Sequence, residues 1–120
     1  MRYQRLSYAY ALVLTPATPA QTAWRPLADV YETPNGISVT VELAGIEAEE
    51  VDVLFFENAV VVEGGRQLPV VEPGAIYHTA EIRRGPFRLE IALPARVSAE
   101  PLELDYQRGL LTMRLVKAKG

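Results

Sequence analysis

The stretch Pro34-Asn35-Gly36-Ile37-Ser38-Val39-Thr40-Val41-Glu42-Leu43 decides the class of fold. Its first three residues are typical of a tight turn between two antiparallel strands. After the turn, apolar and polar side chains alternate, which is the period of a strand with one buried face and one wet face. Residues 27–32 stand just before the turn and are expected to be the partner strand.

Similar short apolar runs, separated by turn residues, continue to the end of the chain. They predict further strands at residues 51–56, 59–62, 76–83, 87–93, 102–106 and 110–116. A short acidic turn, residues 47–50, leads into the first of them. About eight short strands with turns between them indicate an all-β fold, an antiparallel sandwich or barrel. Periodicity alone does not choose among immunoglobulin-like, transthyretin-like, carbohydrate-binding and chaperone sandwiches.

Prolines and glycines divide the chain into parts. Residues 15–23 are poor in large apolar side chains and contain two prolines, which indicates an extended linker. We therefore expect a flexible apolar N-terminal arm and linker over residues 1–23, one sandwich over residues 24–117 and a short tail over 118–120. Residues 67–75 are expected to be a long loop that can carry one edge strand.

The composition excludes several kinds of chemistry. The net charge is −3, whereas nucleic-acid binding depends on clustered Lys and Arg, so no nucleic acid is expected as partner. There is no cysteine, and His78 is the single histidine, so we expect no metal site, no cofactor and no nucleophile of the Cys-His kind. His78 is expected to be structural and to lie on a strand. We expect no enzyme.

The N-terminal segment has two interpretations. Arg2 and Arg5, followed by the apolar residues 8–14, mimic a weak signal peptide, which would favour an extracellular ligand-binding sandwich. The apolar run is far shorter than the roughly 20 residues that span a bilayer, so no stable membrane insertion is expected. We expect a soluble protein in the cytoplasm.

Two motifs in the second half of the chain carry a family resemblance. Gly85-Pro86-Phe87 is followed by Leu93-Pro94, and Gly109-Leu110-Leu111 is followed by Lys117. In this order and spacing they resemble the α-crystallin domain of small heat-shock proteins. Weaker matches precede them at residues 24–26, 29–33, 42–46 and 64–66. The sequence departs from the family pattern at Ala44, Gly65, Leu89, Leu104 and Arg108.

The resemblance implies an immunoglobulin-like sandwich and an ATP-independent chaperone that holds partly unfolded proteins. It also implies a groove between residues 51–56 and 87–93 that accepts a client segment or a partner's tail. The expected groove residues are Leu54, Phe56, Val53, Arg88 and Leu89. Leu54 and Phe56 stand on the face of the strand where Asp52 points, so two apolar groups need cover there. The alternative is that the N-terminal arm covers them permanently.

The family's N-terminal arm binds clients and drives assembly. Here its apolar residues are Tyr3, Leu6, Tyr8, Tyr10, Leu12 and Leu14. The alternative for this segment is an intramolecular strand added to a sandwich edge.

The long loop resembles the segment that bacterial and plant members exchange between subunits, with Leu68, Val70 and Val71 at the interface. The alternative is a disordered loop. We therefore expect a dimer or larger homo-oligomer. Residues 112–120 contain no isoleucine-x-isoleucine motif, so shell assembly by that route is not expected. The alternative function is a co-chaperone or adaptor sandwich, like a CS domain, that docks on one folded partner.

Overall fold

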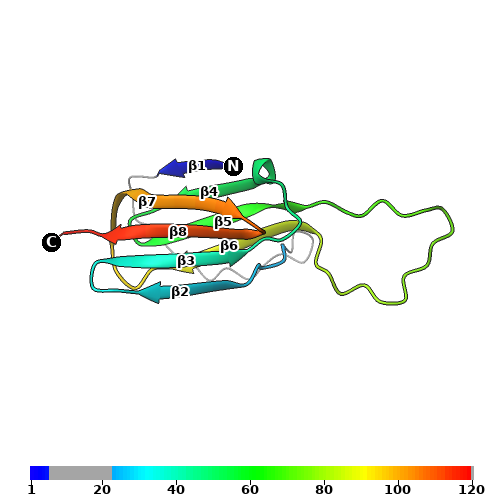
Figure 1. Cartoon of the computed structure of the whole chain (residues 1–120), viewed down its shortest axis with the longest axis horizontal. Helices are drawn as coiled ribbons and strands as arrows, with labels where there is room; N and C mark the ends of the chain where they lie inside the picture. The colour runs from blue at the N-terminus through cyan, green and yellow to red at the C-terminus, as the bar shows by residue number, and fades with distance from the viewer. Residues whose placement is uncertain (6–22, 120) are drawn as a thin grey trace.

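Two sheets face each other in the computed structural model, which describes residues 1–5 and 23–119 (Figure 1). The strands are β1 (Arg2–Arg5), β2 (Ala28–Glu32), β3 (Gly36–Glu42), β4 (Val51–Phe55), β5 (Ala59–Arg66), β6 (Gly85–Ala92), β7 (Val97–Gln107) and β8 (Leu110–Lys117), and the 3₁₀ turn η2 (Ala48–Glu50) precedes β4. One sheet has the order β1-β4-β5-β6 and the other the order β2-β3-β8-β7. Apart from β1, neighbouring strands are antiparallel. The predicted all-β sandwich is confirmed.

Strand β3 lies in the middle of its sheet, which explains why its sequence pattern is so regular. Val39 stands opposite Val30 of β2 on one side and Met113 of β8 on the other. The predicted turn closes the hairpin with β2, since the Thr33 amide donates to the Gly36 carbonyl at 2.8 Å. A central strand buries one face against the other sheet, and the alternation records that face.

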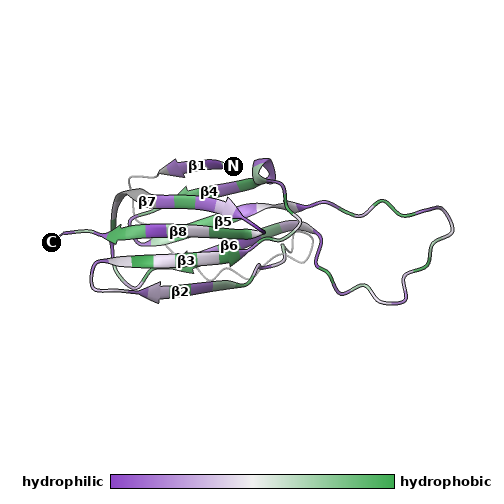
Figure 2. Ribbon diagram, viewed as in Figure 1, coloured by the Kyte–Doolittle hydropathy of each residue, from purple (hydrophilic) through white to green (hydrophobic). Residues whose placement is uncertain are grey.

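The core lies between the sheets and takes every second residue of most strands. Figure 2 shows hydrophobic and hydrophilic bands along β3 and β8. Each fully buried side chain of this size contributes about 1.5–3 kcal/mol relative to an exposed one. The main core residues are Ile37, Val39, Val41, Leu43, Val51, Val53, Phe55, Val60, Val62, Phe87, Leu89, Ile91, Leu111, Met113 and Leu115.

Of the described glycines, Gly64 of β5 has the closest neighbours at the place of a missing Cβ atom. A Cβ atom at this position would lie 2.1 Å from the Glu50 carbonyl oxygen and 2.6 Å from Cζ of Phe87. Both distances are far inside van der Waals contact, so only glycine leaves room for the Phe87 ring. Any larger residue at position 64 would have to displace the Glu50 backbone or the Phe87 ring.

The structure corrects one strand prediction. Residues 67–84 leave the sandwich after β5 and return at β6 as a long extended loop, so residues 76–83 are not a strand (Figure 1). The alternating pattern there was misleading, because a strand also needs a neighbour that takes up its backbone hydrogen bonds. No described strand pairs with this loop. His78 lies in the loop and is exposed, so its expected place on a strand is also wrong.

Strand β1 was only the alternative interpretation of the N-terminal segment. It pairs with β4 in parallel, with Tyr3 opposite Val53 and Arg5 opposite Phe55. Strand β7 is longer than the predicted 102–106. Its first part was not predicted, because two register shifts around Pro101 interrupt the alternation of apolar and polar residues. Both additions lie at sheet edges, where local sequence patterns are weakest.

Candidate binding surfaces

The edge of β4 is the first candidate surface, and β1 occupies it. Nε of Arg2 lies 3.1 Å from Oδ1 of Asp52, and both side chains are largely exposed, at 84% and 43%. The ring of Tyr3 meets that of Phe55 edge to face, with centroids 5.8 Å apart. The attachment includes one short strand, one exposed ion pair and one ring contact, and Met1, directly before β1, packs against the core.

The five residues expected to line a groove are not all at the surface. A pocket of about 480 Å³ between β1 and β4 is lined in part by Val53 and Leu54. The side chains of Val53 and Leu89 are nevertheless 0% exposed and belong to the core between the sheets. They point inward because they alternate with the outer-face residues Leu54 and Arg88. Arg88 reaches two carboxylates, Glu63 at 3.0 Å and Glu90 at 2.9 Å.

The outer face of the β4-β5 pair carries a small second apolar cluster. Phe56, expected to be a groove residue, is only 2% exposed there and packs with Ala59 and Val61. Leu54 is half-buried against the same cluster. Of the expected groove residues, Leu54 and Arg88 are therefore the ones that retain partly exposed side chains.

The expected client-binding arm lies mostly outside the described residues. Leu6, Tyr8, Tyr10, Leu12 and Leu14 all fall there. Tyr3 is described, and it stands in β1 with about half of its side chain exposed. The client-binding role of the arm stays a prediction.

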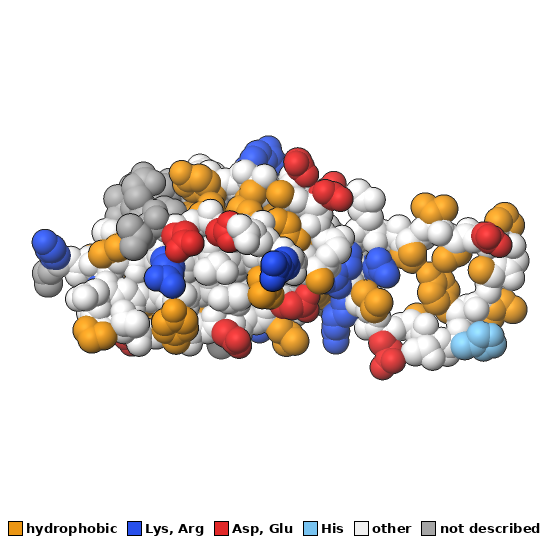
Figure 3. Space-filling model, viewed as in Figure 1, with side chains coloured by type: hydrophobic (Ala, Val, Ile, Leu, Met, Phe, Trp, Pro, Cys, Tyr) orange, Lys and Arg blue, Asp and Glu red, His pale blue; other side chains and the backbone are white. Residues whose placement is uncertain are grey.

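The loop of residues 67–84 carries the largest exposed apolar side chains of the described chain. Figure 3 shows hydrophobic side chains along its whole length, away from the sandwich. Val70 is 100% exposed and Ile76 is 79% exposed. Between the two arms of the loop lies a hollow of about 400 Å³, to which Leu68, Val71 and Tyr77 contribute. Nothing in the sandwich covers these side chains.

The free edge of β2 is a third apolar surface. β2 is an outer strand of its sheet, so one side of its backbone lacks a strand partner in the described chain. Leu27, just before β2, is 73% exposed, and Tyr31 within it is 55% exposed. An unpaired edge with apolar neighbours is a template for another extended segment.

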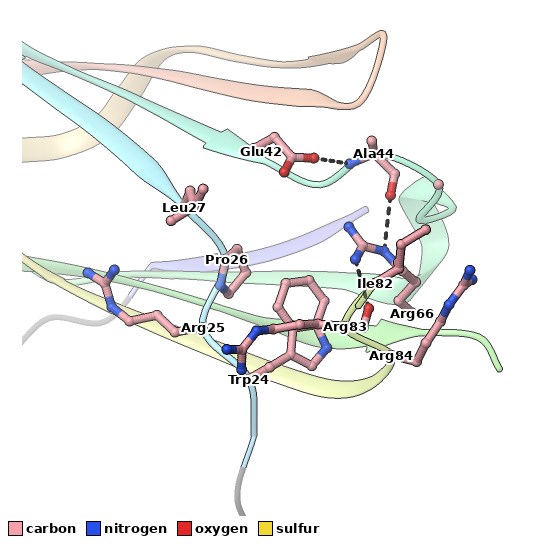
Figure 4. A pocket seen from close by; sticks show the side chains of 11 residues that line it. Trp24, Arg25, Pro26, Leu27, Glu42, Ala44, Arg66, Ile82, Arg83 and Arg84 are labelled. Atoms are coloured by element: carbon pink, nitrogen blue, oxygen red, sulfur yellow. Dashed lines mark hydrogen bonds between the residues drawn. The ribbon is translucent and has the colours of Figure 1, made fainter. Parts of the chain in front are cut away.

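A pocket of about 740 Å³ lies where the loop leaves the sandwich; we call it the root pocket (Figure 4). Its central contact is the Arg66 guanidinium over the Trp24 ring, 4.6 Å from the centroid. Trp24 also donates its indole N–H to the Gly85 carbonyl at 3.0 Å. Both residues belong to segments that resemble family motifs, 24–26 and 64–66. Their contact was not predictable from the sequence, because the two segments are far apart in the chain.

Known proteins with similar sequences and similar structures identify the family to which this architecture belongs. A model of the Hsp20/alpha crystallin family matches residues 29–120. The chain belongs to this family. Heat shock protein 16 of Schizosaccharomyces pombe is 32% identical over 98 residues, which cover 78% of this chain and 67% of that protein. Small heat shock protein C2 of Rickettsia felis is 28% identical over 92 residues, which cover 77% of this chain and 60% of that protein.

Solved structures of the family have the same sandwich. The structure of heat shock protein 16.0 from Schizosaccharomyces pombe superposes with a TM-score of 0.70 at 29% identity, covering 82% of this chain and 90% of that one. A small heat-shock protein from Xylella fastidiosa gives a TM-score of 0.69 at 23% identity, over 82% of this chain and 91% of that one, which supports the fold alone.

The motifs that carried the family resemblance have identifiable structural roles. Phe87 is a core residue at the Gly64 contact, and Leu111 is a core residue of β8. Gly85 and Gly109 both have positive φ, at 83° and 80°, which glycine adopts without strain. Leu93 is half-buried, whereas Pro94 and Leu110 are exposed. Most of these family residues therefore build the sandwich.

The described residues contain neither a metal-ligand cluster nor a membrane-spanning helix. Among residues 1–5 and 23–119, no group of three or more His, Cys, Asp or Glu side chains is placed to hold a metal ion. Within the same residues, no helix has the length and apolar character that crossing a membrane requires.

Proposed function

We propose that this chain is an ATP-independent chaperone, a holdase, that binds partly unfolded proteins in the cytoplasm and prevents their aggregation without catalysis or cofactor. The observation that carries the proposal is the row of exposed apolar side chains along residues 67–84. Exposed apolar patches of this kind mark sites of protein interaction. Membership in the Hsp20/alpha crystallin family supports the same function.

The loop serves first to join two copies of the chain. It offers an extended backbone and the apolar side chains Leu68, Val70 and Val71, while β2 of a second copy offers an unpaired edge beside Leu27 and Tyr31. Adding a strand to this edge satisfies backbone groups on both sides. Each large side chain covered in this way contributes up to about 1.5–3 kcal/mol. A reciprocal exchange of loops gives a symmetric dimer.

Client segments bind at the edge of β4 and at the outer face around Leu54. An extended, partly unfolded chain competes there with β1, whose attachment to β4 is short and exposed. The displaced arm then presents Tyr3, together with Leu6, Tyr8, Tyr10, Leu12 and Leu14, to the same client. Phe56 is already buried beneath this surface and acts as its support.

The test is light scattering of a heat-labile dehydrogenase with and without the chain, in the absence of ATP, beside a measurement of native mass. We expect suppressed scattering at near-stoichiometric ratios from a dimer or larger species. The variant Leu68→Ser/Val70→Ser/Ile76→Ser should reduce the native mass. The control Gln67→Ser/Thr79→Ser changes exposed polar residues of the same loop and should behave like the wild type. Unchanged scattering in the presence of wild-type chain would sink the holdase proposal.

An adaptor that docks on one folded partner is the second candidate. It is favoured by the burial of Phe56 and by the pairing of β1 with the β4 edge, which reduce the apolar surface that a client could reach there. This candidate requires a monomer that leaves aggregation unchanged. The same two measurements therefore separate it from the holdase.

A further inference from the structure

The root pocket is unusually rich in positive charge for an acidic chain. The sequence has a net charge of −3 and 12 Lys and Arg residues, and four of these residues line this one pocket. They are Arg25, Arg66, Arg83 and Arg84. Figure 3 shows Lys and Arg side chains gathered at the root of the loop.

The only acidic residue that lines the pocket does not neutralise these charges. One Glu42 carboxylate oxygen accepts the Ala44 amide at 3.0 Å (Figure 4). Arg66 donates to main-chain carbonyls, those of Ala44 at 3.1 Å and Arg83 at 2.8 Å. In the described part of the chain, none of the four arginines forms a salt bridge. With four arginines and one glutamate in its lining, the pocket carries a net positive charge.

Most other cations whose side chains the structure describes are paired, with the exposed Arg108 and Lys119 as exceptions. Arg2, Arg96, Arg114 and Lys117 each lie between 2.6 and 3.6 Å from a carboxylate oxygen. Clustering like charges in one hollow raises the energy of the isolated molecule, and an opposite charge lowers it again. The arrangement at the root pocket therefore fits an anionic partner.

An acidic segment of suitable chemistry lies directly beside this pocket. Gly45 lines the pocket, and the chain continues into Glu47, Glu49 and Glu50. These three side chains are exposed, and no described cation lies in salt-bridge range of them. Figure 3 shows acidic side chains near η2, toward the top of the view. We call Glu47, Glu49 and Glu50 the acidic turn.

Hydrogen bonds fix the backbone of residues 43–46, which connects the root pocket to the acidic turn. The Tyr106 hydroxyl contacts the carbonyls of Leu43 and Ile46, and Arg66 holds the carbonyl of Ala44. The acidic turn therefore keeps a fixed place next to the root pocket, and its residues are not among those that line it.

We propose that the root pocket of one copy binds the acidic turn of a second copy. Patches of opposite charge that lie side by side are self-complementary about a two-fold axis that runs between them. Such an axis brings each acidic turn to the other copy's arginines, so one surface makes both contacts. A contact of this kind depends on electrostatic complementarity and weakens as salt is added.

Charge reversal tests this contact without relying on the chaperone function. Arg83→Glu/Arg84→Glu reverses the pocket, and Glu47→Lys/Glu49→Lys reverses the turn. All four residues are exposed, so the core is untouched. Arg96→Glu/Lys119→Glu is the control for the pocket variant, because it changes the net charge by the same amount and sign at exposed sites outside the pocket; it also removes the exposed ion pair of Arg96 with Glu57. Circular dichroism confirms folding, and Arg83→Gln/Arg84→Gln replaces the first variant if that one unfolds.

Sedimentation at low and high salt then measures self-association. We expect each reversed variant to associate at least about tenfold more weakly than wild type at low salt, and the control to match wild type. An equimolar mixture of the two reversed variants should associate again, because the acidic pocket of one meets the basic turn of the other and the reverse contact is also attractive.

Two outcomes would overturn the proposal. One is a mixture that stays as dissociated as its components, because another anionic segment would then be the occupant. The other is wild-type association in the pocket-reversed variant. These variants leave the apolar side chains of the loops intact, so the salt-dependent association measured here is the step beyond a loop-held dimer, and failure of this contact leaves the proposed chaperone function standing.

Discussion

Two side chains of β1, Arg2 and Tyr3, contact β4, and both are themselves more than half exposed. Arg2 supplies the ion pair to Asp52, and Tyr3 supplies the ring contact to Phe55. The double substitution Arg2→Ala/Tyr3→Ala leaves the backbone pairing possible and removes both contacts. If client segments compete with β1, this change should favour the client.

The magnitude follows from the two contacts. An exposed ion pair contributes about 0.2–1 kcal/mol, and an edge-to-face ring pair adds about 0.5–1.5 kcal/mol. The opening equilibrium of β1 should therefore shift by about 3- to 60-fold, since about 1.4 kcal/mol corresponds to a factor of ten. Global stability should change little, because opening of an edge strand is a local event.

Hydrogen exchange of the β4 amides measures this opening directly. Their protection should fall by that factor, while the β3 amides, in the middle of the other sheet, stay protected. The aggregation assay should need less of the variant than of wild type for the same suppression. Arg114→Ala is the control, because it removes a comparable exposed ion pair, to Glu103, far from β1. Unchanged β4 protection in the double variant would refute the reasoning.

Three further predictions concern the sandwich itself. Gly64→Ala should lower the free energy of unfolding by about 1–3 kcal/mol, because the new methyl group overlaps the Glu50 carbonyl and the Phe87 ring; Gly65→Ala, whose Cβ has nothing nearer than 3.7 Å, is the matched control. Phe87→Ala should cost about 3–5 kcal/mol in denaturant unfolding, because it empties a fully packed site. Burial raises the pKa of Tyr106, so the folded chain holds this proton more tightly than the unfolded chain. The resulting stabilisation is complete below pH about 10 and is lost as pH rises through the raised pKa; Tyr106→Phe should therefore flatten the alkaline limb of a plot of stability against pH.

The central strands of the sandwich could be predicted from the sequence, because the alternation of buried and exposed positions along them is regular. Val39 and Val41 alternate with polar residues, and both are core residues in a central strand. The spacing of Gly85, Phe87 and Gly109 pointed to the family for an equally physical reason. Each of these positions combines a backbone or packing requirement with one residue type that meets it.

The surfaces were harder to predict, because they depend on what lies opposite each residue. Residues 76–83 have an alternating pattern, yet the single chain gives them no neighbouring strand. The alternation placed Leu54 and Phe56 on the outer face, but it did not show that Ala59 and Val61 pack with Phe56 there. The root pocket depends on the meeting of Trp24 and Arg66, which only the folded chain brings together.

The contact between Arg66 and Trp24 also gives the protein an intrinsic fluorescent probe at the root of the loop. Trp24 is the single tryptophan of the chain, so all indole emission arises at the root of the loop. A guanidinium lies over its ring, and the Phe87 ring lies 5.3 Å away, centroid to centroid. Any event that moves the loop, or brings another molecule to its root, changes the colour or the lifetime of this one fluorophore. The protein therefore reports on its own assembly in unlabelled form, at the speed of a stopped-flow mixing experiment.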